Sequence, residues 1–134
     1  KFGLTNHPLL GQLQKGKDIV YKGKKILVKN ATKLVKGKKI SIILDTAFSQ
    51  SIVKAVKDSD LLIIESTYLS EIKEKARLNK HLTSQEAARI AKLGKVKKLI
   101  LTHISKRYKD TKVLLKEAKR IFKNTIVAHD LMTI

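Results

Sequence analysis

Four polar side chains stand directly after short apolar runs, where a strand of a sheet is expected to end. They are Asp45, Glu65, His103 and Asp130. In an open α/β sheet the carboxyl ends of the strands line one crevice, so side chains placed there can converge. Carboxylate oxygen and imidazole nitrogen are both zinc ligands. The pattern therefore predicts a His and carboxylate site, although any one of these residues alone would more often form a turn or cap a helix.

A further histidine, His81, stands just before Thr83 and Glu86, a pair typical of a capping box at the start of a helix. Backbone amides at a helix start favour a nearby phosphate. This position suits an acid–base or phosphate-contacting role, and it equally suits an ordinary loop residue. A structural role is also open for His103 at this point.

The expected order of strands and helices along the chain, which must position these residues, predicts a single α/β domain over residues 1–134. Gly and Pro mark residues 1–17 as an irregular entry segment. Strands are expected at 18–21 and 25–28 as a hairpin, at 39–44 as a largely buried strand, and at 61–64, 98–102 and 125–128. Helices are expected after a cap at Ser49 or Ser51, over about 70–79, from the capping box to Gly94, and after a cap at Asp110 with Leu114, Ala118, Ile121 and Phe122 inward.

The composition points to a polyanionic partner. Thirty Lys and Arg against 11 Asp and Glu give a formal net charge of +19, which favours nucleic acid over a merely solvated Lys-rich surface. The absence of Cys excludes disulfides and thiolate metal ligands. No long apolar run or signal peptide is present, so we expect a soluble, cytoplasmic protein without a membrane partner. No phosphate-binding Gly loop or Ser nucleophile elbow occurs.

Five motifs follow one another along the chain: Ile43–Thr46, Asp60–Tyr68, His81–Ala88, Leu101–Tyr108 and Ala128–Met132. In this order they resemble ribonuclease Z, the metal-dependent endonuclease of the metallo-β-lactamase superfamily that removes the 3′ trailer from precursor tRNA. The likeness extends to the opening segment from Phe2 to Gly16 and so covers nearly the whole chain. It implies the C-terminal half of a metallo-β-lactamase-type αβ/βα sandwich.

The resemblance also implies roles for particular residues. Asp45 would bridge two zinc ions and His103 would bind one of them. His81, oriented by Glu65, would meet the scissile phosphate and assist departure of the 3′ oxygen. Ser105, Arg107 and Tyr108 would support the metal site, and Arg107 could also contact phosphate. The complete protein is expected to be a homodimer.

The sequence departs from the family pattern in three respects. Leu44 stands where the family has Gly before the bridging Asp, and His7 stands where Gly precedes the early Pro8. The family's His-x-His-x-Asp-His motif, which supplies most zinc ligands, is absent. We therefore expect the 134-residue chain, which starts at Lys1 and resembles a fragment, to bind zinc weakly and to cleave little by itself.

Two other functions remain open. A metallo-β-lactamase fold can serve another phosphodiesterase or hydrolase, acting on a cyclic nucleotide or a small ester. A non-catalytic basic RNA-binding module would instead show binding with steep salt dependence and no response to zinc or chelator.

Overall fold

The computed structural model describes residues 3–134 and divides the chain into two compact units, Lys1–Gly37 and Lys38–Ile134. Each unit has its own apolar cluster. The single domain expected over 1–134 stays a prediction, because two compact units can both be parts of one domain. Phe2, which opens the segment that resembles the family, lies outside the described residues.

The first unit is a hairpin with two short helices. Strands β1 (Ile19–Tyr21) and β2 (Lys24–Ile26) pair antiparallel, which confirms the predicted hairpin. Lys22 and Gly23 both have positive φ, as a tight two-residue hairpin turn requires. Helix α2 (Val28–Ala31) follows the hairpin.

The expectation of an irregular segment over 1–17 is wrong for α1 (Leu9–Gln14). Leu13 at the end of α1 packs with Ile19 and Ile26 of the hairpin, so burial of an apolar face stabilises a helix in spite of the nearby glycines. His7 stands just ahead, and its Nδ1 accepts a hydrogen bond from the Leu9 amide at 3.2 Å.

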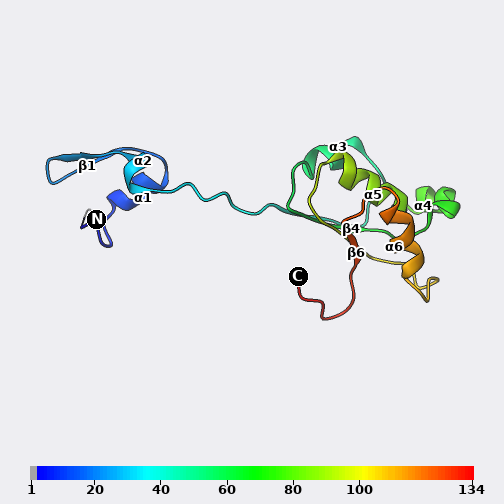
Figure 1. The fold of residues 1–134 in the computed structure, drawn as a ribbon. Helices are drawn as coiled ribbons and strands as arrows, with labels where there is room; N and C mark the ends of the chain where they lie inside the picture. The colour runs from blue at the N-terminus through cyan, green and yellow to red at the C-terminus, as the bar shows by residue number, and fades with distance from the viewer. Residues whose placement is uncertain (1–2) are drawn as a thin grey trace. The chain divides into compact units, whose positions relative to one another are not determined.

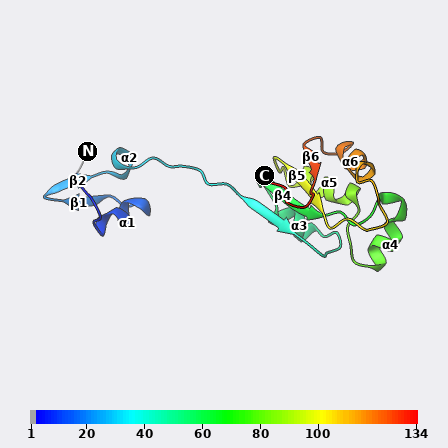
Figure 2. The same ribbon diagram turned by 90° about the horizontal axis from the view of Figure 1, so that it is seen from below.

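The second unit contains a four-stranded parallel sheet in the order β3-β4-β5-β6. The strands are β3 (Ile40–Ile43), β4 (Leu61–Glu65), β5 (Leu99–Thr102) and β6 (Thr125–Val127), which confirms the four expected there. Parallel strands need crossover connections, and helices supply them. They are α3 (Gln50–Ala55), η1 (Ser70–Ile72) with α4 (Lys73–Leu78), α5 (Ser84–Leu93), and α6 (Lys112–Lys119). Figures 1 and 2 show these elements of the unit from two directions.

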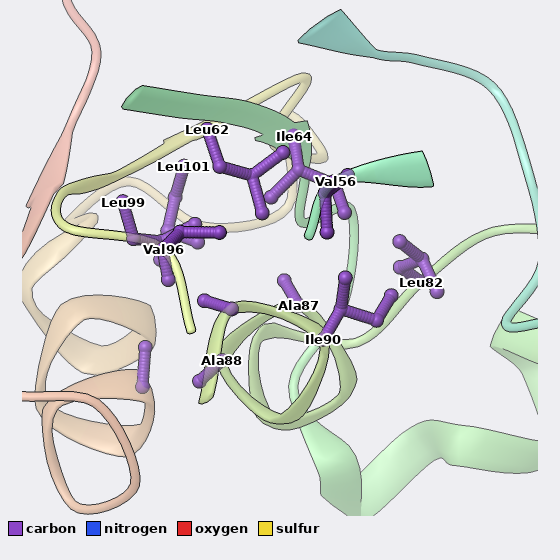
Figure 3. Close-up of a cluster of buried hydrophobic side chains, with 12 residues drawn as sticks. Val56, Leu62, Ile64, Leu82, Ala87, Ala88, Ile90, Val96, Leu99 and Leu101 are labelled. Atoms are coloured by element: carbon purple, nitrogen blue, oxygen red, sulfur yellow. The ribbon is translucent and has the colours of Figure 1, made fainter. Parts of the chain in front are cut away.

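The core of this unit lies between the sheet and α5. Leu62 and Ile64 of β4 and Leu99 and Leu101 of β5 point toward Ile90 and the small residues of the helix (Figure 3). Alternate residues of these strands share one face, and Ala87, Ala88 and Ala91 let the helix approach it closely. The strand ends are thereby fixed on a rigid support.

The predicted starts of α3 and α5 are confirmed, whereas α6 differs from the prediction: its N-cap residue is Thr111 rather than Asp110, and it ends at Lys119, ahead of Ile121 and Phe122. Ser49 caps α3, and Thr83 and Glu86 form the capping box of α5. Gly94 ends α5 with φ −74°, so it is not needed for a left-handed turn. A Cβ on Gly94 would lie 2.7 Å from Val56 Cγ2, and close helix packing is therefore the reason for glycine. Asp110 Oδ1 accepts from the Lys112 amide at 2.9 Å ahead of α6.

The expectation of a largely buried strand at 39–44 is wrong. Ile40 and Ile42 are 60% and 61% exposed, and Leu44 is also exposed. These residues occupy the edge strand β3, and the two isoleucines lie on one face of it. A run of apolar residues indicates a buried strand only when both faces of that strand are covered by other elements.

Within residues 3–134, helices that combine the length and the apolar character needed to cross a membrane do not occur.

Candidate metal and acid–base site

The ends of three neighbouring strands bring the predicted site residues to one edge of the sheet. Glu65 is the last residue of β4, His103 follows β5 directly, and Asp45 stands two residues after β3. The parallel register pairs Ile43 with Ile64 and Glu65 with Thr102, so the strands end at similar heights.

The fourth residue of the site, His81, comes from the loop between α4 and α5. Its backbone amide donates to the Ala76 carbonyl at 2.8 Å. The next residue, Leu82, is fully buried in the core. The loop is thus fixed on both sides of the histidine.

Asp45, His81 and His103 lie together. His103 Nε2 is 3.3 Å from Asp45 Oδ1, and His81 Nδ1 is 3.9 Å from the same oxygen. One ligand atom from each of the three residues lies within 4.8 Å of the others. The two imidazole rings are tilted, with centroids 5.3 Å apart. Sequence reasoning placed these residues at one site, and the structure brings them together.

The separation of Asp45 and His103 fits a bound metal ion. Ligands about 2.1 Å from a tetrahedral zinc ion lie about 3.4 Å from each other. The 3.3 Å between His103 Nε2 and Asp45 Oδ1 matches this spacing. Histidine nitrogen with carboxylate oxygen is also a donor set that zinc accepts.

Glu65 is the acceptor at the centre of the site. Its side chain is fully buried. Oε1 accepts from the Thr46 amide, and Oε2 accepts from the Leu82 amide at 3.0 Å and from Thr67 Oγ1 at 2.8 Å. His81 Nδ1 lies 3.1 Å from Oε2. A buried carboxylate needs several donors, and here they satisfy it while joining the Asp45 loop to the His81 loop.

Thr67 extends this network to His103, a role that sequence reasoning missed. Thr67 Oγ1 lies 3.1 Å from His103 Nδ1, on the opposite side of the ring from Asp45. A hydrogen bond to one ring nitrogen fixes the orientation of the other as a ligand. The sequence analysis could have named Thr67, since it stands two residues after Glu65 in the same motif.

The backbone at both candidate ligands is in the left-handed region. Asp45 has φ +48° and His103 has φ +54°. Such values are uncommon outside glycine, and Asp and His adopt them more readily than bulkier residues. Leu44 is not among the residues with positive φ, so the departure from glycine at this position does not disturb the turn.

The three residues predicted to support the site form the turn after His103. The Ser105 amide donates to the Thr67 carbonyl at 3.2 Å, and Tyr108 Oη accepts from the Leu69 amide at 3.0 Å. Arg107 lies over the Tyr68 ring, 5.2 Å from its centroid. The Tyr68 ring in turn meets His81 edge to face. These contacts hold the turn against the segment that follows β4, while Arg107 remains exposed.

Asp130, the fourth strand-end residue, is exposed beyond β6. In the part of the chain that the structure describes, it does not join the group of Asp45, His81 and His103. The carboxyl end of β6 thus contributes nothing comparable to the other three.

The fold places this chain in a structural class. The solved structure of YhfI from Bacillus subtilis, a metallo-β-lactamase fold protein, matches the fold of this chain. The TM-score is 0.59 at 25% identity, over 90% of this chain and 59% of that one. The predicted fold class is confirmed: the chain has the α/β architecture of part of a metallo-β-lactamase fold.

Within this class, the relatives are ribonuclease Z. The chain is 42% identical over 125 residues to "Ribonuclease Z" of Protochlamydia amoebophila, covering 93% of this chain and 41% of that protein. It is 38% identical to that of Archaeoglobus fulgidus, over 100% of this chain and 44% of the relative. Human tRNase Z, short form, matches with a TM-score of 0.58 at 35% identity, over 73% of this chain and 33% of that one. No family model matches the chain.

The chain therefore spans less than half the length of the curated relatives it matches. The resemblance to the C-terminal half of ribonuclease Z is confirmed.

Proposed function

We propose that this chain carries part of the active site of a zinc-dependent endoribonuclease that removes the 3′ trailer from precursor tRNA. One observation carries the proposal: a carboxylate and an imidazole stand at metal-ligand spacing beside a second imidazole held by a buried glutamate. The identity to proteins named ribonuclease Z supports the substrate. The net charge of +19 suits a polyanionic RNA.

In the proposed site, Asp45 and His103 would hold the metal. Asp45 is exposed and offers carboxylate oxygens, and His103 Nε2 would be the nitrogen ligand. A divalent metal bound there supplies Lewis acidity toward a phosphoryl oxygen. Two protein ligands do not fill a tetrahedral shell. The remaining positions would be taken by water and by residues outside this chain.

His81 acts on the leaving group. Its Nδ1 lies 3.1 Å from Glu65 Oε2, and a carboxylate at that nitrogen orients the ring so that Nε2 is on the side away from Glu65. When the oxygen of water bonds to phosphorus and the P–O3′ bond breaks, His81 Nε2 gives its proton to the departing O3′. One hydrogen of the water stays on the new 5′ phosphate, and its other proton passes to solvent, from which His81 is protonated again. The products are a 3′ hydroxyl on the tRNA and a 5′ phosphate on the trailer.

The decisive experiment is a chimera. The 125-residue region of the Protochlamydia relative that matches this chain is replaced by this chain. We expect cleavage of precursor tRNA that EDTA removes and zinc restores. Asp45→Ala should abolish it, and His81→Ala should slow it by about 100-fold or more. Glu71→Ala, an exposed carboxylate on η1, is the control and should cleave normally.

A folded, zinc-loaded chimera without cleavage, or near-normal cleavage by its Asp45→Ala variant, would contradict the proposal. A small phosphodiester and a small ester assayed beside precursor tRNA distinguish another hydrolase of the same fold. RNA binding that ignores zinc and EDTA identifies the non-catalytic module. A homodimer and a cytoplasmic location are part of the same proposal and rest on the resemblance.

A further inference from the structure

A pocket of about 410 Å³ adjoins the site on the side of His81. We call it the α4–α5 pocket, since two helices form most of its walls. Its volume is within the roughly 300–1,000 Å³ of small-ligand sites. The lining residues are Ala47, Phe48, Lys73, Arg77, His81, Glu86, Arg89 and Leu93.

The charges in this pocket are mainly positive. Lys73 and Arg77 are one turn apart on α4, and Arg89 faces them from α5. Glu86 is the one carboxylate of the lining. It is engaged by the Thr83 amide and hydroxyl of the capping box, and Lys73 Nζ lies 3.8 Å from it. Arg89 is exposed and, within residues 3–134, forms no ion pair. Arg77 Nη1 pairs with Glu74 Oε1 at 3.1 Å on the exposed side of α4, which leaves the other donors of its guanidinium group. Arg89 and these remaining donors of Arg77 can bind an anion.

Phe48 supplies an aromatic face to the same pocket. It stands in the loop after Asp45 and is 38% exposed. Exposed aromatic rings beside cationic groups are the combination that binds single-stranded nucleic acid, because the ring stacks on a base while the cations hold the phosphate.

The position of His81 fixes which nucleotide this pocket would take. His81 lines the pocket, whereas Asp45 and His103, which lie beside His81, are not among the lining residues. In an in-line displacement the attacking and leaving oxygens are on opposite sides of phosphorus. The nucleotide that carries the departing O3′ therefore lies on the side of His81.

We infer that the α4–α5 pocket is the subsite for the nucleotide immediately 5′ of the scissile phosphate, with its base on Phe48 and its own phosphate on Arg77 and Arg89. The inference rests on the proposed function for the assignment of the leaving side. It adds a substrate position and three residues to the site.

The test uses the full 134-residue chain without metal. The probe is a 5′-phosphorylated RNA dinucleotide that ends in 2-aminopurine with a free 3′ hydroxyl, which resembles the product end. Its fluorescence reports stacking and its titration reports affinity. We expect Phe48→Leu to weaken binding about tenfold and to reduce the stacking signal. The double change Arg77→Gln with Arg89→Gln should weaken binding at least tenfold and lower its salt dependence.

The matched control is Lys116→Gln with Lys119→Gln on α6, which removes the same charge away from this pocket. It should change affinity less than twofold, and equal urea midpoints for all variants show that folding is intact. The inference is overturned if the pocket variants bind like the original chain, or if the α6 variant loses as much. Because the measurement needs neither metal nor cleavage, failure of the chimera to cleave is a separate result.

Discussion

Glu65 Oε2 lies 3.1 Å from His81 Nδ1, and the two residues come from a strand and from a loop 16 positions later in the chain. The same carboxylate accepts hydrogen bonds from the backbone amides of Thr46, which follows Asp45, and Leu82, which follows His81. One buried anion therefore sets the positions of two loops and the orientation of a histidine. Its loss should affect folding as well as chemistry.

Glu65→Gln is the first prediction. An amide replaces one oxygen by a donor, which faces N–H groups where an acceptor is needed. Hydrogen bonds to a charged group contribute roughly 1.5–3 kcal/mol, so we expect the free energy of unfolding to fall by about 2 kcal/mol. Urea denaturation measures it. Glu71→Gln on η1 should leave the free energy of unfolding within about 0.5 kcal/mol, and an equal loss there would refute a special role for Glu65.

Thr67 is expected to tune metal binding without touching the metal. Thr67→Val keeps the shape of the side chain but removes the hydroxyl beside His103 Nδ1. Loss of such a partner weakens metal affinity by about 10- to 100-fold. Zinc titration of the chimera by competition with a chelating dye measures this affinity. Thr67→Ser retains the hydroxyl and should bind zinc normally; if Ser and Val behave alike, the hydrogen bond has no role in holding the metal.

Asp60 should make the stability of the second unit depend on pH. The Lys97 ammonium at 2.7 Å, with the Lys39 amide at 2.9 Å, lowers the pKa of this carboxyl from 3.8 to about 2. A pKa lower in the folded state means that ionised Asp60 favours folding above about pH 4. This contribution is lost as pH falls toward 2.

Asp60→Asn should therefore be less stable than the original chain at pH 7, and the difference should shrink between about pH 4 and pH 2. Urea midpoints at a series of pH values measure this. Asp58→Asn is the matched control, since Asp58 is exposed in a left-handed turn that Asn tolerates. If the urea midpoint of Asp60→Asn differs from that of the original chain by the same amount at pH 2 and at pH 7, the electrostatic explanation is contradicted.

Gly94→Ala tests close packing between α5 and the residue that ends α3. The new Cβ would lie 2.7 Å from Val56 Cγ2 and 3.0 Å from the Ile90 carbonyl oxygen. Overpacking of this kind costs about 1–3 kcal/mol. Val56→Ala removes the atom that the new Cβ would meet. The double variant should therefore lose less free energy of unfolding than the sum of the losses in the two single variants. Gly37→Ala, which has open space around its Cβ, should be nearly neutral; strict additivity would refute the clash.

The sequence by itself determined most of the second unit and was enough to name the residues of the candidate site. Apolar strand runs, the capping box and the polar residues at strand ends are local patterns of residue types. They can be recognised in the sequence without tertiary information. The order of five motifs then indicated the family. Asp45, Glu65, His81 and His103 were all named from these signals, and the structure places them together.

Tertiary structure alone decided the rest. The role of Thr67, the reason for glycine at 94, the exposure of β3 and the pocket beside His81 depend on which elements lie next to each other. A local pattern states what a residue can do, but a contact between residues far apart in the chain exists only once folding has paired them. The helix at Leu9–Gln14 is the converse case, since burial against the hairpin outweighed the glycines that locally indicated irregular structure.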